Sequence, residues 1–282
     1  MGAWFARFLK QNGYQTAICD KNRRAALGLA RHHRYKLINN PLLAIQKAQV
    51  VVLATPTDVT ARLMKRFEPY LTRRHLVVEI SSIKEPIRAT LRAMNQRGIP
   101  VLSIHPMFGP GIKRLAGKAV LTVLAPSRNV NANQLLSSFR RAGARIIRTD
   151  FEKHERITSV TLALPHFLNI TLVSTLESFG FSPNELRAVA GTSFNLQLLL
   201  AEAIYKESPT NESSILTENK RSLNVLSAYM KQNKKTMAAV ARGDKATLIR
   251  NLKNGRDFLK GDTRYPDAYD RFSAALEAAN LC

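Results

Sequence analysis

The spacing of apolar and polar residues changes about halfway along the chain. In the first half, a continuous apolar run at 50–54 and similar, largely apolar runs at 76–80, 100–104 and 120–124 alternate with stretches in which apolar residues recur at helical spacing. A continuous apolar run is expected for a strand that is buried on both faces, as in a parallel sheet covered by crossover helices. The pattern therefore predicts an α/β domain with a parallel sheet over residues 1–150.

Further strands are expected at 15–19 and 145–148, and helices near 57–71, 84–97 and 130–142. The second half contains no convincing strand pattern. Helical spacing runs instead through stretches near 151–179, 183–205, 211–236, 243–260 and 267–280. The sequence thus predicts an all-helical second domain over residues 151–282.

The first residues fit the end of a dinucleotide-binding fingerprint, which reads strand, G-x-G-x-x-G, helix, strand and then an acidic residue about 20 positions on. Gly2 fits the last glycine, and Asp20 ends the next strand-like run. We therefore predict a Rossmann-type domain whose first strand is missing. Asp20 is expected to hydrogen-bond the ribose of NAD, while Arg23 and Arg24 keep NADP open as the cofactor.

The missing strand and glycines have two explanations, and the sequence does not decide between them. Met1 is the internal methionine of a longer G-x-G-x-Met-Gly motif, or the domain is truly truncated and binds a dinucleotide poorly. A further alternative takes Gly2 as a flexible terminus that binds nothing.

Two loops follow predicted strands at the edge where α/β proteins bind their ligands. Thr55 and Pro56 come after the strand at 50–54, and Ser82 comes after the next one. We expect the first pair to contact a cofactor and Ser82 to lie at the same edge. Simple helix capping, by Thr57 in one loop and by serine in the other, is the alternative.

His105 ends a predicted strand, and the loop after it is stiffened by Pro106, Gly109 and Pro110. A lone histidine is usually structural. One that is held at the ligand edge by a rigid loop suits acid–base chemistry, because imidazole titrates near neutrality. His105 is therefore the strongest candidate for a catalytic group.

His166 follows Pro165 inside the long apolar stretch at 151–179. The proline should kink that helix and interrupt its hydrogen bonding. A polar ring on an apolar helix needs a partner, so His166 is either a substrate-binding residue or a satisfied core histidine.

Composition narrows the class of protein. The chain has 282 residues, of which 45% are apolar, and this is enough for two globular domains. We expect neither a membrane span nor a secretory leader. Cys19 and Cys282 are the only cysteines, so we expect no disulfide framework and no metal site. A reducing cytoplasm fits this composition best.

The charge is uneven. The net charge is +23, and residues 1–150 carry 26 Lys and Arg against 6 Asp and Glu, a net +20. Such an excess attracts anions, for example nucleotide phosphates, an acidic substrate or nucleic acid. The basic residues are scattered singly and no nucleic-acid-binding motif accompanies them. We therefore take most of them as a solvated surface, and nucleic acid is not the expected partner.

Together these motifs resemble the prephenate dehydrogenase family over nearly the whole chain. The resemblance rests on the Met-Gly-x-Trp-Phe-Ala-x-Phe-Leu start, the Ser-Ile-Lys segment, the His-Pro-Met-Phe-Gly-Pro loop, the His154-Glu155-Arg156 helix start and the Leu-Pro-His-Phe kink. It implies an enzyme that oxidises prephenate, or arogenate, with NAD or NADP and loss of carbon dioxide on the route to tyrosine. It also implies a homodimer.

The resemblance also implies roles for three residues. His105 would take the proton of the ring hydroxyl, Ser82 would orient that hydroxyl or the histidine, and His166 would help to place the substrate. One departure is notable, because family members usually carry an arginine for a substrate carboxylate where this chain has Ala203. Another cation then substitutes, or the substrate differs; nearby candidates are Arg187, Lys206 and Arg221.

Two other functions stay open. The chain could be a different hydride-transfer enzyme of the same architecture, such as a hydroxyacid dehydrogenase, although the His-Pro-Met-Phe-Gly-Pro loop speaks against this. It could also be a non-catalytic binding protein, for which the missing glycines, Ala203 and the basic first half are the support.

Overall fold

The computed structural model describes residues 1–281, and Cys282 lies outside the described residues. Contacts divide the chain into two units. Unit 1 comprises Met1–Thr158 together with Glu218–Lys220, and unit 2 comprises Ser159–Thr217 and the residues from Arg221 onward. The sequence predicted a domain boundary near residue 150, which is the start of helix α7 (Phe151–Thr158). The contacts instead divide the chain after Thr158. That helix belongs to unit 1, where its first residue is buried in the core.

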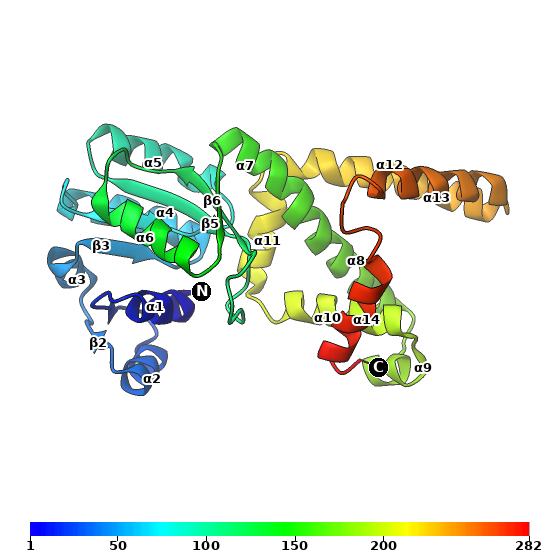
Figure 1. Ribbon diagram of the computed structural model, residues 1–282, viewed down its shortest axis with the longest axis horizontal. Helices are drawn as coiled ribbons and strands as arrows, with labels where there is room; N and C mark the ends of the chain where they lie inside the picture. The colour runs from blue at the N-terminus through cyan, green and yellow to red at the C-terminus, as the bar shows by residue number, and fades with distance from the viewer. Residues whose placement is uncertain (282) are drawn as a thin grey trace. The chain divides into compact units, whose positions relative to one another are not determined.

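Unit 1 is built on a five-stranded sheet (Figure 1). In spatial order, its strands are β3 (Val50–Leu53), β4 (Leu76–Glu79), β5 (Val101–Pro106), β6 (Ala119–Leu124) and β7 (Arg145–Arg148). Each lies where the apolar pattern predicted a strand. The predicted α/β class of this half is therefore confirmed.

Helices cover both faces of this sheet, namely α1 (Gly2–Gln11), α4 (Thr57–Phe67), α5 (Glu85–Gln96) and α6 (Val130–Arg141). Leu76 and Val78 pack in one core cluster with α1 and α6, whereas Val77 packs in a second cluster with α4 and α5. Successive side chains of a strand point to opposite faces. Burial on both faces is the reason why the central strands are largely apolar.

One pairing departs from the all-parallel sheet that the sequence predicted. Strands β3, β4 and β5 are parallel, but β6 runs antiparallel to β5, and β7 is parallel to β6. The reason lies in the connection, because residues 107–118 between β5 and β6 contain no helix. A chain that returns to the sheet without a crossover helix pairs antiparallel.

A separate two-stranded parallel sheet is formed by β1 (Ala17–Ile18) and β2 (Lys36–Leu37). The chain between them forms α2 (Arg23–His33), and α3 (Pro41–Lys47) follows. The sequence predicted β1 but neither β2 nor these two helices. Helix α2 buries only two alanines and is rich in arginine, so its apolar face is small.

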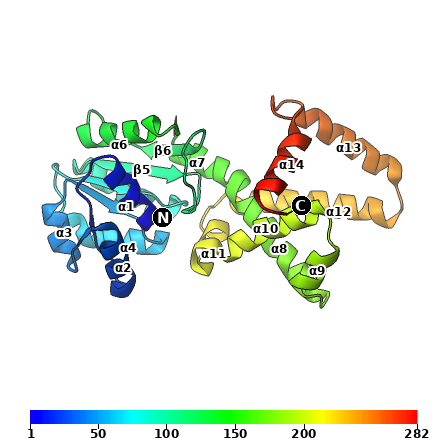
Figure 2. The same ribbon diagram turned by 60° about the horizontal axis from the view of Figure 1, so that its bottom comes forward.

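Unit 2 is helical throughout the described residues (Figure 2). Its helices are α8 (Leu164–Ser178), α9 (Pro183–Val189), α10 (Thr192–Tyr205), α11 (Pro209–Thr217), α12 (Ser222–Ala241), α13 (Lys245–Leu259) and α14 (Ala268–Ala278). Gly243 links α12 to α13 with a φ of 63°, a left-handed conformation that favours glycine. The predicted all-helical second half is confirmed.

The long helices that the sequence predicted are interrupted. Between α7 and α8 lies a π-helical turn, η2 (Ser159–Ala163), immediately before Pro165. A proline offers no N–H and its ring crowds the preceding turn, which accounts for the wider turn here. The stretch at 183–205 splits into α9 and α10 at Gly191. The stretch at 211–236 splits where Glu218–Lys220 joins unit 1.

The sequence was expected to contain no membrane span; by length and composition alone, Phe151–Ser178 is apolar enough to cross a membrane, although polar residues interrupt it. Only 22% of its most apolar window is buried inside the protein. The large apolar side chains of helix α8 are half-buried, so the chain covers them only in part.

Candidate active site

The parallel strands β3, β4 and β5 end at one edge of the sheet. In their register, Leu53 pairs with Glu79 and Glu79 pairs with Ser103. Shortly after these positions come the predicted site residues Thr55, Pro56, Ser82 and His105. The structure thus places them at the carboxyl edge, where α/β proteins bind their ligands.

Two threonines fix the turn after β3. Their hydroxyl oxygens, Thr55 Oγ1 and Thr60 Oγ1, lie 2.7 Å apart, and Thr60 Oγ1 also donates to the Thr55 carbonyl oxygen at 3.0 Å. Helix α4 has Pro56 as its N-cap residue, and no side chain caps it. The alternative in which Thr57 caps this helix is therefore wrong, and its first amides are available to a ligand.

Ser82 is half-buried in the loop after β4. Helix α5 begins later, with Lys84 as its N-cap residue and without a side-chain cap, so helix capping by the serine is also wrong. Among residues 1–281, the Ser82 hydroxyl finds no hydrogen-bond partner. It is free to bond a ligand at this edge.

A buried ionic cluster that the sequence did not reveal supports this edge. Lys84 Nζ lies 2.6 Å from Glu79 Oε1 and donates to the Ile104 carbonyl oxygen at 2.8 Å. Glu79 also accepts hydrogen bonds from the Ser103 hydroxyl and the Ser81 backbone N–H. Burial lowers the pKa of Lys84, and the Glu79 carboxylate opposes this effect. The cluster joins β4, β5 and the start of α5.

His105 occupies the end of β5 and is only 3% exposed. Its Nδ1 lies 3.0 Å from Nε2 of His154, and His154 Nδ1 lies 3.2 Å from Glu155 Oε1. Burial, followed by the charges of His154 and Lys84, holds the pKa of His105 well below its ordinary value of 6.5. The ring is therefore neutral at pH 7, which is the form that accepts a proton.

Helix α7 carries His154 and Glu155 and is fixed within unit 1 from two sides. Lys84 donates its backbone N–H to Glu155 Oε1 at 3.2 Å. The Asn219 side chain donates to the Glu155 carbonyl oxygen at 2.9 Å and to Thr158 Oγ1 at 3.2 Å. Because these contacts are buried, the two side chains beside His105 are held in place.

Gly2 opens helix α1 beside the loop after β3, since a Cβ at Gly2 would lie 3.6 Å from the Ala54 Cβ. Helix α1 has no side-chain cap and no acidic residue in its first turn. Asp20 is exposed in the segment after β1, where its carboxylate accepts the Asn22 N–H at 2.8 Å. The structure thus brings Gly2 to the loop that holds Thr55, while Asp20 lies in the small-sheet segment.

His166 lies in unit 2, on α8, and its Nδ1 is bonded to the Glu212 carboxylate of α11. Both side chains are largely buried. One turn further along α8, Asn169 accepts a hydrogen bond from Gln197 of α10 at 2.8 Å. The partner that the sequence required for this ring is therefore a carboxylate within the same unit.

The position of the expected arginine, Ala203, is exposed on α10. Of the cations suggested to replace it, Arg187 is engaged with Glu202 at 2.6 Å, and Lys206 is exposed. Neither is built into a buried polar cluster of the kind that surrounds His105.

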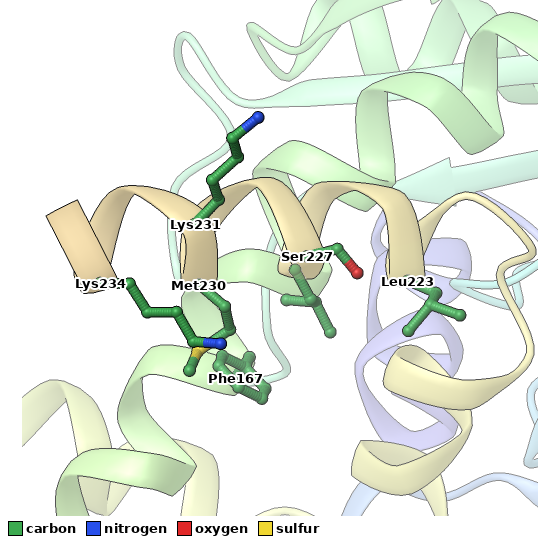
Figure 3. A pocket seen from close by; sticks show the side chains of 7 residues that line it. Phe167, Leu223, Ser227, Met230, Lys231 and Lys234 are labelled. Carbon is green, nitrogen blue, oxygen red and sulfur yellow. The ribbon is translucent and has the colours of Figure 1, made fainter.

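Unit 2 also contains an open apolar pocket of about 480 Å³ between α8 and α12 (Figure 3). It is lined by Phe167, Leu223, Leu226, Ser227, Met230, Lys231 and Lys234. Met230 and Lys234 lie beside the Phe167 ring, whereas Lys231 points away from it. This lining suits apolar packing better than acid–base chemistry.

Two family models match consecutive parts of the chain. Residues 5–148 match the nucleotide-binding domain of prephenate dehydrogenase, and residues 150–254 match its dimerization domain. The chain belongs to the prephenate dehydrogenase family. The resemblance that the sequence motifs indicated is thereby confirmed.

Curated members of the prephenate dehydrogenase family align with most of this chain. It is 27% identical over 257 residues to the "Probable arogenate/prephenate dehydrogenase" of Methanocaldococcus jannaschii, covering 90% of this chain and 57% of the relative. It is 24% identical to the "T-protein" of Haemophilus influenzae, covering 92% and 64% of the two chains. The chain thus spans about three fifths of the length of these relatives.

Solved structures of the prephenate dehydrogenase family share the fold. The prephenate dehydrogenase of A. aeolicus in complex with hydroxyphenyl propionate and NAD+ matches with a TM-score of 0.74 at 18% identity, covering 93% of this chain and 95% of that one. The arogenate dehydrogenase of Synechocystis matches with a TM-score of 0.66 at 16% identity, covering 91% and 94%. These likenesses extend through both units.

The contacts of several residues near His105 were not predicted from the sequence, although Lys84, His154 and Glu155 stand in the quoted motifs. Glu79, Lys84 and Ser103 form the buried cluster, and His154 and Glu155 continue from His105. A carboxylate inside the apolar run at 76–80 was one available signal, because a charge in a buried strand needs a partner. The adjacent histidine and glutamate at the start of the second half were another.

Proposed function

We propose that this chain oxidises prephenate, or its amino analogue arogenate, with NAD as hydride acceptor and with loss of carbon dioxide. The observation that carries the proposal is the neutral, buried imidazole of His105 at the carboxyl edge of a nucleotide-binding domain. Oxidation at a carbon that bears a hydroxyl needs a group to remove the hydroxyl proton. A neutral histidine at this edge supplies that group.

The roles follow from the free groups at the edge. His105 takes the proton of the ring hydroxyl, and Ser82, whose own hydroxyl is unengaged, orients that hydroxyl. The nicotinamide, when bound, accepts the hydride that leaves the same carbon. Loss of carbon dioxide then makes the ring aromatic, which drives the reaction. The protein therefore needs accurate positioning and a single base.

The residues present fit a dinucleotide. The uncapped start of α1 offers amide N–H groups and a positive helix end to a pyrophosphate, and Gly2 leaves room for its approach. Thr55 and Pro56 precede a second uncapped helix start at the same edge. The Asp20 carboxylate is exposed and suits the ribose hydroxyls of NAD. Arg23 and Arg24 keep NADP as a second cofactor.

We assign His166 to substrate positioning. Its pairing with Glu212 bears on the choice of substrate. Unit 2 has a carboxylate beside His166, whereas position 203 lacks the arginine that family members usually carry for a substrate carboxylate. A carboxylate suits the ammonium group of arogenate better than the keto acid of prephenate. Arogenate is therefore the second candidate substrate.

We further propose a homodimer that forms through unit 2. The dimerization-domain match covers residues 150–254, and large apolar side chains are exposed there, among them Leu200, Leu223 and Met237. A second copy of the chain would cover this surface, so no membrane is needed to explain it. We also place the enzyme in the cytoplasm, where the exposed thiol of Cys19 would stay reduced.

The proposal is tested by following NADH formation after prephenate or arogenate is added to the purified full chain with NAD, and separately with NADP. Turnover with either substrate supports it. Retained cofactor binding without turnover of either substrate would refute it. A panel of 2-hydroxy acids in the same assay checks the alternative of another hydride-transfer enzyme.

A further inference from the structure

His105, His154 and Glu155 form a line of hydrogen bonds inside unit 1. His105 Nδ1 faces His154 Nε2 at 3.0 Å, and His154 Nδ1 faces Glu155 Oε1 at 3.2 Å. All three side chains are buried. Since a neutral imidazole has one donor and one acceptor nitrogen, the proton on each ring follows from the bonds along the line.

The Glu155 carboxylate sets which atom donates and which accepts in each hydrogen bond of the line. Glu155 Oε1 accepts the backbone N–H of Lys84 at 3.2 Å, which marks this oxygen as an acceptor. His154 Nδ1 must then carry the proton that it donates to Glu155. With its proton on Nδ1, a neutral His154 has a bare Nε2, which accepts from Nδ1–H of His105.

We propose that His154 and Glu155 are positioning residues that hold His105 in the tautomer with a bare Nε2, so that this nitrogen is the base for the substrate. This inference rests on the proposed function of the site. In the step itself, the O–H bond of the ring hydroxyl breaks and an N–H bond forms at His105 Nε2. The hydride passes from the same carbon to the nicotinamide, His154 stays neutral and Glu155 stays anionic.

The geometry leaves Nε2 of His105 for a ligand. Among residues 1–281, no hydrogen bond is formed by this nitrogen, whereas Nδ1 is occupied. Helix α7, which carries both positioning residues, is held by Asn219 through the Glu155 carbonyl oxygen and Thr158. The orientation of the His154 ring is set by its own two hydrogen bonds, from Nε2 to His105 and from Nδ1 to Glu155.

Burial is the main reason why His154 stays neutral. Burial lowers its pKa, the Glu155 hydrogen bond raises it, Lys84 lowers it again, and Glu155 and Glu79 raise it by their charges; the net direction is downward from 6.5. A protonated His154 would donate from both nitrogens. It would force the proton of His105 onto Nε2 and remove the base.

The tautomer is measured directly by ¹⁵N NMR of the wild-type chain labelled at its histidines, six in number, without substrate at pH 7.5. The His105 signals are assigned by their absence in His105→Asn. We expect a protonated Nδ1 and a bare, pyridine-like Nε2. Signals that show the proton on Nε2 would overturn the proposal. This readout needs no turnover, so it stays informative even if the proposed reaction fails.

A variant tests the consequence for catalysis. His154→Phe removes the acceptor for His105 Nδ1, and kcat should fall at least about tenfold with KM and the cofactor Kd nearly unchanged. Glu155→Gln keeps an oxygen that accepts from His154, so its ¹⁵N pattern should stay as in wild type. A His154→Phe enzyme with wild-type kcat, or a reversed tautomer in wild type, contradicts the proposal.

The matched control is His75→Phe. His75 is also fully buried in unit 1, but it precedes β4 at the opposite edge of the sheet, where its Nδ1 accepts the Thr72 N–H at 2.9 Å. This variant should lose stability by a similar amount and keep its kcat. An equal loss of kcat in both variants would assign the effect to general destabilisation and overturn the positioning role.

Discussion

The two units differ in which side chains they bury and which they expose. Unit 1 buries a paired lysine and carboxylate, Lys84 and Glu79, and covers its apolar strands with helices on both faces. Unit 2 leaves large apolar side chains such as Leu223 and Met237 exposed. The core and the buried ion pair of unit 1 are thus formed by residues of a single chain. Unit 2 needs further contacts to cover its surface.

This difference matches two different requirements, those of a catalytic base and those of an association surface. A base must be held in one protonation state, which requires fixed partners and exclusion of water. The site around His105 obtains both from residues of a single unit. An association surface must instead stay open until the second copy arrives.

The largest expected effect on stability comes from breaking the buried pair. Lys84→Met removes the charge that neutralises Glu79 and leaves a buried carboxylate without its cation. We expect a loss of about 3–5 kcal/mol in the free energy of unfolding, measured by urea denaturation.

The control is Arg62→Met, which breaks an exposed ion pair with Asp58. Its cost should be about 0–1 kcal/mol, because exposed pairs are screened by water. Equal costs for the two variants would show that the cluster beneath the site is not the buried ionic unit described above.

The contrast also explains what could be predicted from the sequence. The strands of unit 1 were found because burial on both faces produces largely apolar runs, of which residues 50–54 form a continuous one. Helix α2 was missed because it buries only Ala26 and Ala30. The antiparallel β6 was missed because a loop without a helix decides its direction.

The site was predictable where one local segment carries it. His105 was found because it follows a strand and precedes a proline-bounded loop, and the structure places it at the expected edge; its role as base stays a proposal. The hydrogen bonds that join His154 and Glu155 to His105 were not predicted, because these residues come from a distant segment. Glu155 meets the Lys84 amide across 71 positions of the chain. Such pairs depend on the tertiary fold, which no local pattern encodes.

The next effect is on assembly. Leu223→Glu places a charge on the apolar surface of unit 2 at a side chain that is 72% exposed. We expect the chain to pass from dimer to monomer in light scattering after gel filtration, because an unpaired charge is costly in a buried interface.

Val130→Glu is the matched control, since Val130 is 76% exposed but lies on α6 of unit 1, outside the dimerization-domain match. It should leave the mass unchanged. A dimer that survives Leu223→Glu and dissociates with Val130→Glu would move the association surface to unit 1.

The smallest effect is the dependence of stability on pH. The pKa values of His105 and His154 are lowered in the folded protein, chiefly by burial. Below pH 6.5 the unfolded chain therefore binds protons that the folded chain does not, and stability falls as the pH decreases. Each histidine contributes at most about 1.4 kcal/mol per pH unit.

Urea midpoints between pH 7.5 and pH 5.5 measure this slope. His105→Asn should flatten it, whereas replacing the exposed His32 by Asn should not. A slope that steepens in His105→Asn would mean that the imidazole is charged in the folded state.

The most direct test of the central claim is the turnover of His105→Asn with prephenate or arogenate and NAD, compared with wild type and His75→Asn. If His105 is the base, kcat falls by about 10²–10⁴ while the cofactor Kd stays the same, and His75→Asn keeps its activity. Turnover of His105→Asn within about threefold of wild type would contradict the account.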